Sequence, residues 1–525
     1  MSTGPAAALP HVHATSAALL ADAARRAPHA PALAFGQRRL DYADYLACVA
    51  GFAGELAALG VRGGRVATVL ANSLEACVAA FAVQAAGAQL VPLNPLYTAR
   101  ELDALLRDAQ PALLLVDDSL ADALAAPARA AGVGRVLALG PASRLLDAWR
   151  GRPAALPDPA PEPGDPALLQ YTGGTTGRAK GVNLSHRAVM TNVAQRQALL
   201  PVEGENERVL CVMPLFHSYA MAMGLFLAAY SRACLVVLPR YHPDEVLAAI
   251  ERERITIFPG SPTIFTGLMA HPAFARTDWH RVHTCYSGAS ALPQETLRRW
   301  REAVGAPVYE GYGQTEAGPV LSFNPAGGPV KAGSVGVAAP GTEIEIVDVE
   351  SGTRVLAAGE RGEIRARGPQ IMQGYRDRPE ETAQALRDGW LYTGDIGELD
   401  DDGYLYIRDR KKDMVIVGGY NVYPREVEEV LMLHPDVLEA AVIGRPDARR
   451  GESVHAFVAL REGAGVDAEA LVEHCRANLV RYKIPERIEL VAALPKTGVN
   501  KIDKAALRAG GFPHAPGPAV SPESP

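Results

Sequence analysis

The chain has 525 residues, which is more than a single hydrophobic core usually serves, so two or more domains are expected. Its composition is that of an ordinary globular protein, with 48% hydrophobic and 21% charged residues, and its formal net charge of −7 argues against nucleic acid as the main partner. The six cysteines are scattered without a CxxC pair, which argues against metal knuckles and a disulfide framework and favours a cytoplasmic protein with reduced thiols.

Helix and strand patterns alternate from about residue 14 to residue 310. Asp41 is placed to cap a helix over 42–59, and Ser73 to open a helix that Gly87 closes. Apolar strand patterns occur at 65–70, 90–93, 168–171, 208–213, 234–238, 256–258 and 282–286. Short apolar strands between amphipathic helices predict an α/β fold with a large N-terminal domain of doubly wound parallel sheets.

Two segments of this first part break the pattern. Residues 151–166 hold six prolines and no apolar period, so we expect an exposed extended loop or linker. Residues 211–230 carry no charge over a length that could span a membrane, but Pro214, His217 and Ser218 lie near the start. A buried strand followed by a helix is the preferred interpretation, and no transmembrane segment is expected.

The period changes to two in the stretches 342–347, 363–367 and 404–407, which predicts a small β subdomain. A charged run at 408–413 then separates it from a smaller α+β unit that ends near Gly510. We therefore expect an N-terminal domain over 1–409, a small mobile C-terminal domain over 410–510, and a disordered Pro-rich tail at 511–525.

The strongest local motif is the sequence YTGGTTGRAKG at 171–181. Its glycines allow successive backbone N–H groups to point inward, and its hydroxyls and cations add donors and positive charge, as a polyphosphate requires. It follows a strand pattern and precedes a helix that Ser185 can cap, but it lacks the lysine position of a Walker A loop. The candidate phosphate-binding residues are Thr172, Gly173, Gly174, Thr175, Thr176, Gly177 and Lys180.

This motif resembles the phosphate-binding signature of the adenylate-forming superfamily, which includes acyl-CoA synthetases, peptide-synthetase adenylation domains and beetle luciferases. Further motifs occur in the order of that family, and the first is YEGYGQTE at 309–316. The resemblance implies that Tyr312 and Gly313 lie at the adenine, that Thr315 touches the α-phosphate region, and that Glu316 holds Mg²⁺. The small-residue loop that would cover the opposite adenine face comprises Gly288, Ala289 and Ser290.

The remaining motifs place the ribose site and the mobile domain. YTGD at 392–395 resembles the ribose-binding motif, which gives that role to Asp395, and Arg410 matches an arginine near the ribose. Lys412 matches the position about which the small domain swings, and Gly418 and Gly419 match a loop that lines the pantetheine tunnel. PKTGVNKI at 495–502 resembles the motif of the adenylation lysine, which would be Lys501.

Two departures from the family pattern are mild. Ala179 stands where the family usually has proline, and Asn500 stands where it usually has glycine. Asparagine is the residue that best tolerates a positive φ after glycine, so we expect the loop before Lys501 to keep its form.

The resemblance implies an acid–thiol ligase that uses ATP and Mg²⁺ to form an acyl-adenylate and then transfers the acyl group to coenzyme A. No Asp or Glu occurs from residue 209 to 243, which disfavours an amino-acid substrate because its ammonium would need a buried carboxylate. A medium- or long-chain fatty acid is the expected substrate, with an aryl acid second, and its candidate contacts are His217, Ala222, Gly224 and Thr263.

Two alternative functions stay open at this stage. The enzyme could load a separate carrier protein instead of coenzyme A, or the chain could be a non-catalytic nucleotide-binding protein. The second alternative would be expected to have lost Glu316 or Lys501, and both are present. Oligomeric state and peripheral contact with a membrane are left open by the sequence.

Overall fold

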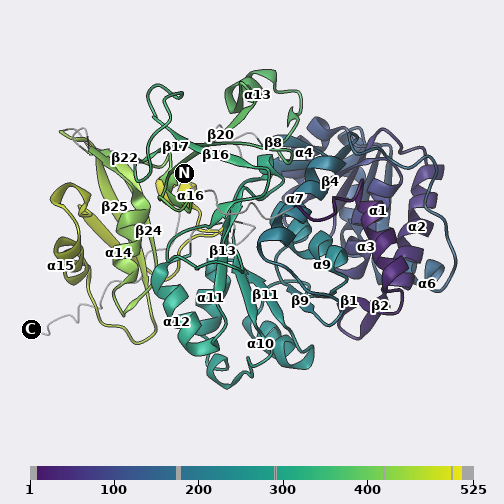
Figure 1. Cartoon of the computed structure of the whole chain (residues 1–525), viewed down its shortest axis with the longest axis horizontal. Helices are drawn as coiled ribbons and strands as arrows, with labels where there is room; N and C mark the ends of the chain where they lie inside the picture. Colours follow the sequence, from purple (N-terminus) through teal and green to yellow (C-terminus); the bar gives the residue numbers. More distant parts are fainter. Residues whose placement is uncertain are drawn as a thin grey trace, which may run out of the picture.

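The computed structural model describes residues 9–172, 179–288, 290, 292–417, 420–447, 449–497 and 501–510. In this part of the chain two large sheets with their helices form the main body, a small antiparallel sheet lies beside them, and a fourth sheet belongs to a separate C-terminal unit (Figure 1).

The first large sheet is parallel in its centre and antiparallel at both ends. Nine described strands form it in the order β15 (Val337–Ala338), β14 (Ser322–Phe323), β13 (Val308–Tyr312), β12 (Thr284–Ser287), β11 (Ile257–Gly260), β9 (Arg208–Cys211), β10 (Cys234–Val237), β1 (Pro31–Phe35) and β2 (Arg38–Asp41). The strands from β13 to β1 run parallel, whereas β2, β14 and β15 pair antiparallel.

The second large sheet has the same mixed character. Seven described strands form it in the order β18 (Gly374–Tyr375), β8 (Lys180–Ser185), β7 (Pro166–Thr172), β4 (Gln89–Leu93), β3 (Arg65–Val69), β5 (Leu113–Asp117) and β6 (Arg135–Leu139). Among these strands β8 pairs antiparallel with both β7 and β18, and all the other neighbours pair parallel.

The helices of the main body cover and separate these sheets. They are α1 (Ser16–Arg26), α2 (Tyr42–Ala58), α3 (Leu74–Ala85), α4 (Ala99–Ala109), α5 (Ala121–Ala130), α6 (Leu145–Trp149), α7 (His186–Leu199), α8 (Ser218–Ala220), α9 (Leu227–Ser231), α10 (Pro243–Arg252), α11 (Pro262–Met269) and α12 (Gln294–Val304). Every residue of α3 is buried, and the helix contacts β4 of one sheet and β1 of the other. A helix that is apolar on all sides is stable only in such a position between layers.

The small sheet and the C-terminal unit complete the chain. The small sheet is antiparallel and contains β16 (Glu343–Val347), β17 (Gly362–Arg367), β19 (Leu386–Arg387), β20 (Trp390–Leu399) and β21 (Leu405–Arg410), with α13 (Pro379–Ala385) beside it. The C-terminal unit contains β22 (Val415–Val417), β23 (Tyr420–Val422), β24 (Val437–Asp447), β25 (Gly451–Leu460) and β26 (Arg487–Val491), with α14 (Pro424–Met432), α15 (Ala468–Asn478) and α16 (Lys504–Ala509).

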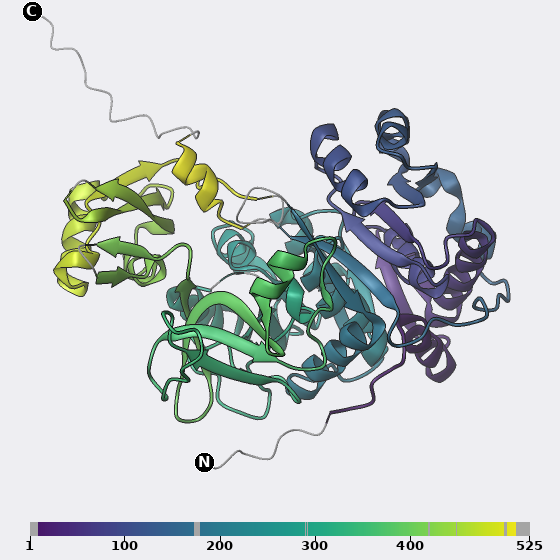
Figure 2. The same ribbon diagram turned by 90° about the horizontal axis from the view of Figure 1, so that it is seen from above.

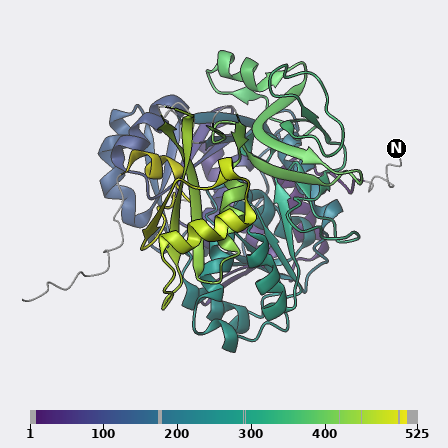
Figure 3. The same cartoon turned by 90° about the vertical axis from the view of Figure 1, so that its left-hand side faces the viewer.

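The C-terminal unit has hydrophobic clusters of its own. Two clusters of buried side chains lie wholly within residues 415–507 and share no residue with the large cluster that joins the two main sheets. Figure 2 shows the unit set to one side of the main body, and Figure 3 shows the molecule from the side of that unit.

The predicted fold class is confirmed, with two corrections. The sheets are mixed rather than purely parallel, because antiparallel strands close their edges. The loop at 171–181 does not lead directly into a helix, since β8 follows it and pairs antiparallel with β7. Ser185 then caps α7 as expected, by accepting a hydrogen bond from the Ala188 N–H.

The uncharged segment 211–230 folds as the end of β9 followed by α8, a π-helical stretch at Met221–Phe226 and α9. The preferred interpretation of a strand and a helix is therefore confirmed. In the described part of the chain no helix is long and apolar enough to cross a membrane.

Candidate functional site

The predicted nucleotide-binding residues lie at the carboxyl ends of strands from both large sheets. β7 ends at Thr172, β12 ends just before Gly288, and β13 ends at Tyr312. In α/β sheets this edge is where ligands bind, because the loops that follow the strands supply backbone donors and polar side chains there.

Asp395 is a buried carboxylate whose partners come from two sheets. The pairing of β20 with β21 sets it opposite Arg410, whose Nε is 3.5 Å from Asp395 Oδ1. Tyr312, from β13, donates its hydroxyl to Asp395 Oδ2 at 2.6 Å. Burial raises the pKa of Asp395, and Arg410 and the Tyr312 hydrogen bond act against that rise. The result is an oriented carboxylate that can accept further hydrogen bonds from hydroxyl groups of a ligand.

Lys501 reaches this cluster from the C-terminal unit. Its backbone is fixed by two contacts with Thr497, whose N–H donates to the Lys501 carbonyl at 2.7 Å and whose Oγ1 accepts from the Lys501 N–H at 3.3 Å. Burial lowers the pKa of Lys501 to about 8, with Arg410 adding to the fall and Asp395 opposing it. The predicted adenylation lysine and the predicted ribose carboxylate are thus neighbours in space although more than 100 positions separate them in sequence.

Lys412 lies in the turn that joins the main body to the C-terminal unit, directly after β21. Burial and the nearby Arg410 lower the pKa of its ammonium group. The preceding residue, Lys411, anchors the turn by donating its N–H to the Gly394 carbonyl at 2.9 Å. The charge of Lys412, like those of Arg410 and Lys501, also acts to lower the pKa of Asp395.

Glu316 lies in a second polar group, next to the end of β13. Its Oε1 accepts a hydrogen bond from the Tyr375 hydroxyl at 2.8 Å, and burial raises its pKa. The ring of Tyr375 also lies under the ammonium of Lys180, 5.0 Å from Nζ to the ring centroid. Tyr375 therefore connects a predicted phosphate-binding cation with the predicted metal ligand.

Close packing explains two of the predicted glycines. A Cβ atom on Gly313 would lie 2.0 Å from the Pro319 carbonyl oxygen, and one on Gly288 would lie 2.7 Å from the Tyr219 ring. Thr315 lies between these loops, where its hydroxyl is 3.3 Å from that of Ser218. Among the other predicted nucleotide contacts, Thr172 is half-buried and Ser290 is exposed. The glycines thus let the loops pass close to their neighbours.

Part of the predicted site lies outside the described residues. These positions are Gly173, Gly174, Thr175, Thr176, Gly177, Ala289, Gly418 and Gly419, together with Asn500 before the lysine.

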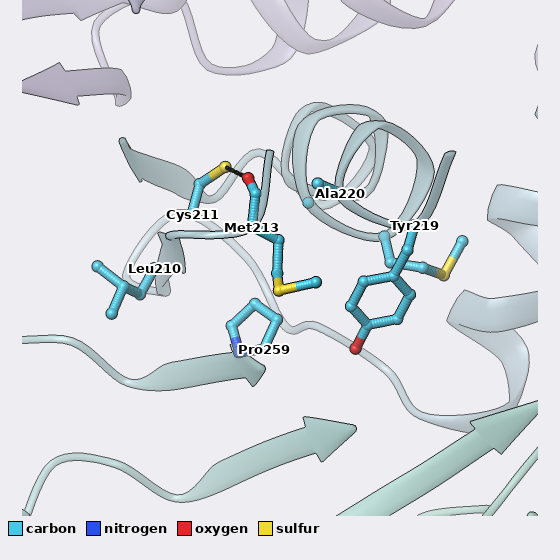
Figure 4. A pocket seen from close by; sticks show the side chains of 8 residues that line it. Leu210, Cys211, Met213, Tyr219, Ala220 and Pro259 are labelled. Carbon is cyan, nitrogen blue, oxygen red and sulfur yellow. Dashed lines mark hydrogen bonds between the residues drawn. The ribbon is translucent and has the colours of Figure 1, made fainter. Parts of the chain in front are cut away.

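A small apolar cavity lies behind this polar edge (Figure 4). It is lined by Leu210, Cys211, Met213, Tyr219, Ala220, Met223, Gly224 and Pro259. None of these lining residues is charged, and the π-helical stretch contributes two of them. Such a cavity suits the apolar part of a small ligand.

The four predicted acyl contacts have different positions. Gly224 lines the cavity, whereas Ala222 is buried but is not among the lining residues, because the π-helical winding turns Ala220, Met223 and Gly224 toward it instead. Thr263, in the first turn of α11, is 3.0 Å from the Ser261 hydroxyl and lies outside the lining as well.

His217 begins the helix that leads into the cavity. Its Nδ1 accepts the Tyr219 N–H at 3.2 Å, so the ring caps α8. Burial and the nearby Lys501 lower the pKa of His217 to about 3, which keeps the ring neutral at physiological pH. His217 therefore connects to the cavity through Tyr219, which it caps, and lies near enough to Lys501 to be affected by its charge.

Sequence reasoning missed Tyr375, and it placed Ser218 and Tyr219 only within the stretch 214–224 expected at the acyl pocket, without giving either residue a role. Tyr375 lies in the two-residue strand β18, and the pairing of β18 with β8 places its hydroxyl beside Glu316. No local sequence pattern identifies Tyr375 as a site residue. Ser218 and Tyr219 directly follow His217, and this position next to a predicted substrate contact was the only sequence feature that pointed to them.

The chain is similar to known proteins over most of its length. The family described as AMP-binding enzyme matches residues 20–376, and the AMP-binding enzyme C-terminal domain matches residues 426–501. A long-chain-fatty-acid–CoA ligase of Bacillus subtilis is 37% identical over 95% of both chains. A feruloyl-CoA synthase of Amycolatopsis sp is 38% identical over 92% of this chain and 96% of its own. The anthranilate CoA ligase AuaEII, solved with anthranoyl-AMP, superposes with a TM-score of 0.88 at 27% identity, over 95% of this chain and 98% of its own.

Proposed function

Because the chain belongs to the family of AMP-binding enzymes, we propose that it is an acid–thiol ligase that converts a carboxylic acid to its acyl-adenylate and then to its coenzyme A thioester. The observation that supports this most directly is the position of Lys501, which lies near enough to Asp395, Arg410 and His217 for its charge to interact with them.

The first step joins the acid to AMP. A carboxylate oxygen of the acid attacks the α-phosphorus of ATP, and pyrophosphate leaves. With a pKa of about 8, Lys501 is cationic at neutral pH and can stabilise the oxygens on which charge develops. Asp395 would hold the ribose hydroxyls and Tyr312 the adenine, so the nucleotide is oriented before reaction. The loop at 172–180 would cradle the phosphates that leave.

Mg²⁺ would be held mainly by the polyphosphate, with Glu316 as the protein ligand. One carboxylate oxygen of Glu316 is engaged by Tyr375, and within the described residues the other accepts no side-chain hydrogen bond. In that same part of the chain no group of three His, Cys, Asp or Glu side chains could enclose an ion. A single carboxylate with phosphate oxygens and water is a common Mg²⁺ arrangement, and the bound ion would neutralise charge on the leaving pyrophosphate.

The second step is attack of the coenzyme A thiolate on the acyl carbon, with AMP as the leaving group. This second step does not need a lysine beside the phosphate, but it needs a path through which the pantetheine arm of coenzyme A can reach the acyl carbon. We propose that the C-terminal unit turns about Lys412 and replaces Lys501 with the loop that carries Gly418 and Gly419. Separate hydrophobic clusters in the two parts support such a movement as a rigid body.

The substrate is proposed to be a monocarboxylic acid with an apolar tail. A fatty acid comes first, because the cavity lining carries no charge and the Bacillus subtilis relative is named for long-chain fatty acids. An aryl acid is the second candidate, favoured by the Tyr219 ring in the lining and by the feruloyl-CoA synthase relative. We place the reaction in the cytoplasm, where ATP and coenzyme A are available.

The test is release of AMP and pyrophosphate from ATP, with and without coenzyme A, across straight-chain, aryl and amino acids. We expect coenzyme A-dependent turnover that is highest with a fatty or an aryl acid and negligible with amino acids. Adenylate that accumulates in the presence of coenzyme A would contradict the thiol acceptor. Absence of pyrophosphate with every acid would contradict the ligase itself.

A further inference from the structure

We propose that the first two turns of α14 dock the C-terminal unit onto the main body, and that the ion pair between Arg361 and Glu426 and the capping contact between Glu429 and α12 hold Lys501 near Asp395. Arg361, Glu426 and Glu429 are then positioning residues for adenylate formation. This inference rests on the proposed ligase activity.

The first contact is a chain of charges that crosses from one part to the other. Arg361, in the small sheet's edge loop, donates from Nη1 to Glu426 Oε1 at 2.6 Å. The same guanidinium donates from Nε to Glu398 Oε2 at 2.9 Å within the main body, and Lys483 holds the other oxygen of Glu426 within the C-terminal unit. Each partner is thus fixed on its own side, which reduces the side-chain entropy lost when the two parts meet.

The ion pair is also partly shielded from water. The side chains of Arg361 and Glu426 are 36% and 20% exposed, and the guanidinium lies 5.5 Å from the centroid of the Tyr423 ring. Glu426 occupies the first turn of α14, where the helix dipole favours a negative charge. The contact is therefore stronger than an ordinary surface pair.

The second contact caps a helix of the main body from the C-terminal unit. α12 begins at Gln294 after Pro293, and no side chain of its own caps it. Glu429 Oε2 accepts the Gln294 N–H at 3.2 Å and so satisfies one of the free donors of that helix end. Its neighbour Arg425 donates to the Ile407 carbonyl at 2.7 Å. Three residues in the first two turns of α14 thus touch three separate segments of the main body.

These contacts and Lys501 lie on different parts of the same C-terminal unit. If the unit moves as a rigid body, loss of the α14 contacts removes support for the orientation that brings Lys501 to Asp395. Adenylate formation then slows, whereas the coenzyme A step, which requires the unit to leave this orientation, does not slow.

The experiment measures both half-reactions in Arg361→Met, Glu426→Gln, the double variant and Glu429→Ala. We expect each single variant to form adenylate about three- to tenfold more slowly, as for the loss of a partly buried ion pair or of a helix cap. The double variant should lose less than the product of the two single losses, since Arg361→Met and Glu426→Gln both remove the Arg361–Glu426 contact. The step from synthetic acyl-adenylate to thioester should keep its rate.

The control is Arg354→Met, which removes an Arg354–Asp348 pair of 3.1 Å in the same region that does not touch the C-terminal unit. It should leave both half-reactions unchanged. Any of three outcomes would overturn the inference. The adenylation rate could be unchanged in Arg361→Met and Glu429→Ala, both half-reactions could slow equally, or the losses of the two single variants could multiply in the double variant.

A second measurement separates failure of this inference from failure of the proposed activity. All six native cysteines are buried, so spin labels at Asp401→Cys and Glu462→Cys, which are exposed positions in the two parts, attach selectively. We expect a single distance that broadens or shifts in Arg361→Met and not in Arg354→Met. This result would stand even if no acid were adenylated, and an unaltered distance distribution in Arg361→Met would overturn the docking role.

Discussion

Burial controls the charged side chains of the candidate site. It raises the pKa of Asp395 and Glu316, raises that of Glu310 on β13 to about 7, and lowers that of Lys501 to about 8. Each group therefore depends on a partner, as Asp395 does on Arg410 and Glu316 on the Tyr375 hydroxyl. A polar ligand that enters such a site meets groups that are already oriented and poorly hydrated.

Lys501 gives the pH prediction at this scale. Its pKa of about 8 lies below the ordinary value of 10.5, so the cation is present below pH 8 and is lost as pH rises above it. We expect kcat/KM for adenylate formation with ATP to fall above about pH 8, approaching about tenfold per pH unit. The pH above which kcat falls should be higher than for kcat/KM, because bound polyphosphate favours the cationic form of Lys501.

Pyrophosphate release in Lys501→Arg is the matched measurement, since arginine stays charged over this range. The alkaline decline should disappear in that variant even if its maximal rate is reduced. A decline at the same pH in Lys501→Arg would assign the titration to another group.

At the scale of the element, the π-helical stretch at Met221–Phe226 decides which side chains face the apolar cavity. A π-helix has more residues per turn than an α-helix, so positions 219, 220, 223 and 224 share the cavity face. Gly224 is the smallest residue of this lining. A Cβ there would meet only Leu235 Cδ1, at 3.9 Å, which is an ordinary contact.

Gly224→Leu is therefore expected to fill the cavity without displacing the backbone. The kcat/KM for the longest accepted acids should fall about 10- to 100-fold, as for the loss of room for one or two methylene groups, while short acids keep theirs. Ala222→Ser, in the same stretch but outside the lining, should leave the chain-length profile unchanged. An equal fall for all acids in Gly224→Leu, at unchanged thermal stability, would place the acyl group elsewhere.

At the scale of the whole molecule, two parts with separate cores are joined by the turn at Lys411–Asp413. The described structure has Lys501 near Asp395, which is the orientation that we propose for adenylate formation. The coenzyme A step is proposed to use another orientation, so the backbone at Lys412 has to rotate between the two steps.

Lys412→Pro tests this rotation, because proline fixes φ at residue 412. Within the described residues the Lys412 N–H donates no hydrogen bond, so none is lost. We expect the thioester step from synthetic acyl-adenylate to slow about tenfold or more relative to adenylate formation. Lys412→Ala removes the same ammonium and leaves φ free, so a comparison of the two variants isolates the backbone. Equal ratios of the two half-reactions in both variants would contradict a hinge at this residue.

The sequence by itself determined the features that depend on neighbours along the chain. Asp41, Ser73 and Ser185 cap α2, α3 and α7 as predicted, because a cap bonds to an N–H only two or three residues away. The ordered motifs likewise predicted the family, and hence the fold class, since each motif is a continuous stretch whose backbone and side chains act together.

Only the tertiary structure decided which distant groups meet. Several features depend on partners that are far away in sequence. They are the pairing of β8, the antiparallel edges of the sheets, the contact of Tyr375 with Glu316, and the presence of Met223 rather than Ala222 in the cavity lining. The same holds for Lys501, whose neighbours Asp395 and His217 come from separate sheets and helices of the main body. Burial and strand pairing are set by packing between elements, and no local pattern of residues specifies them.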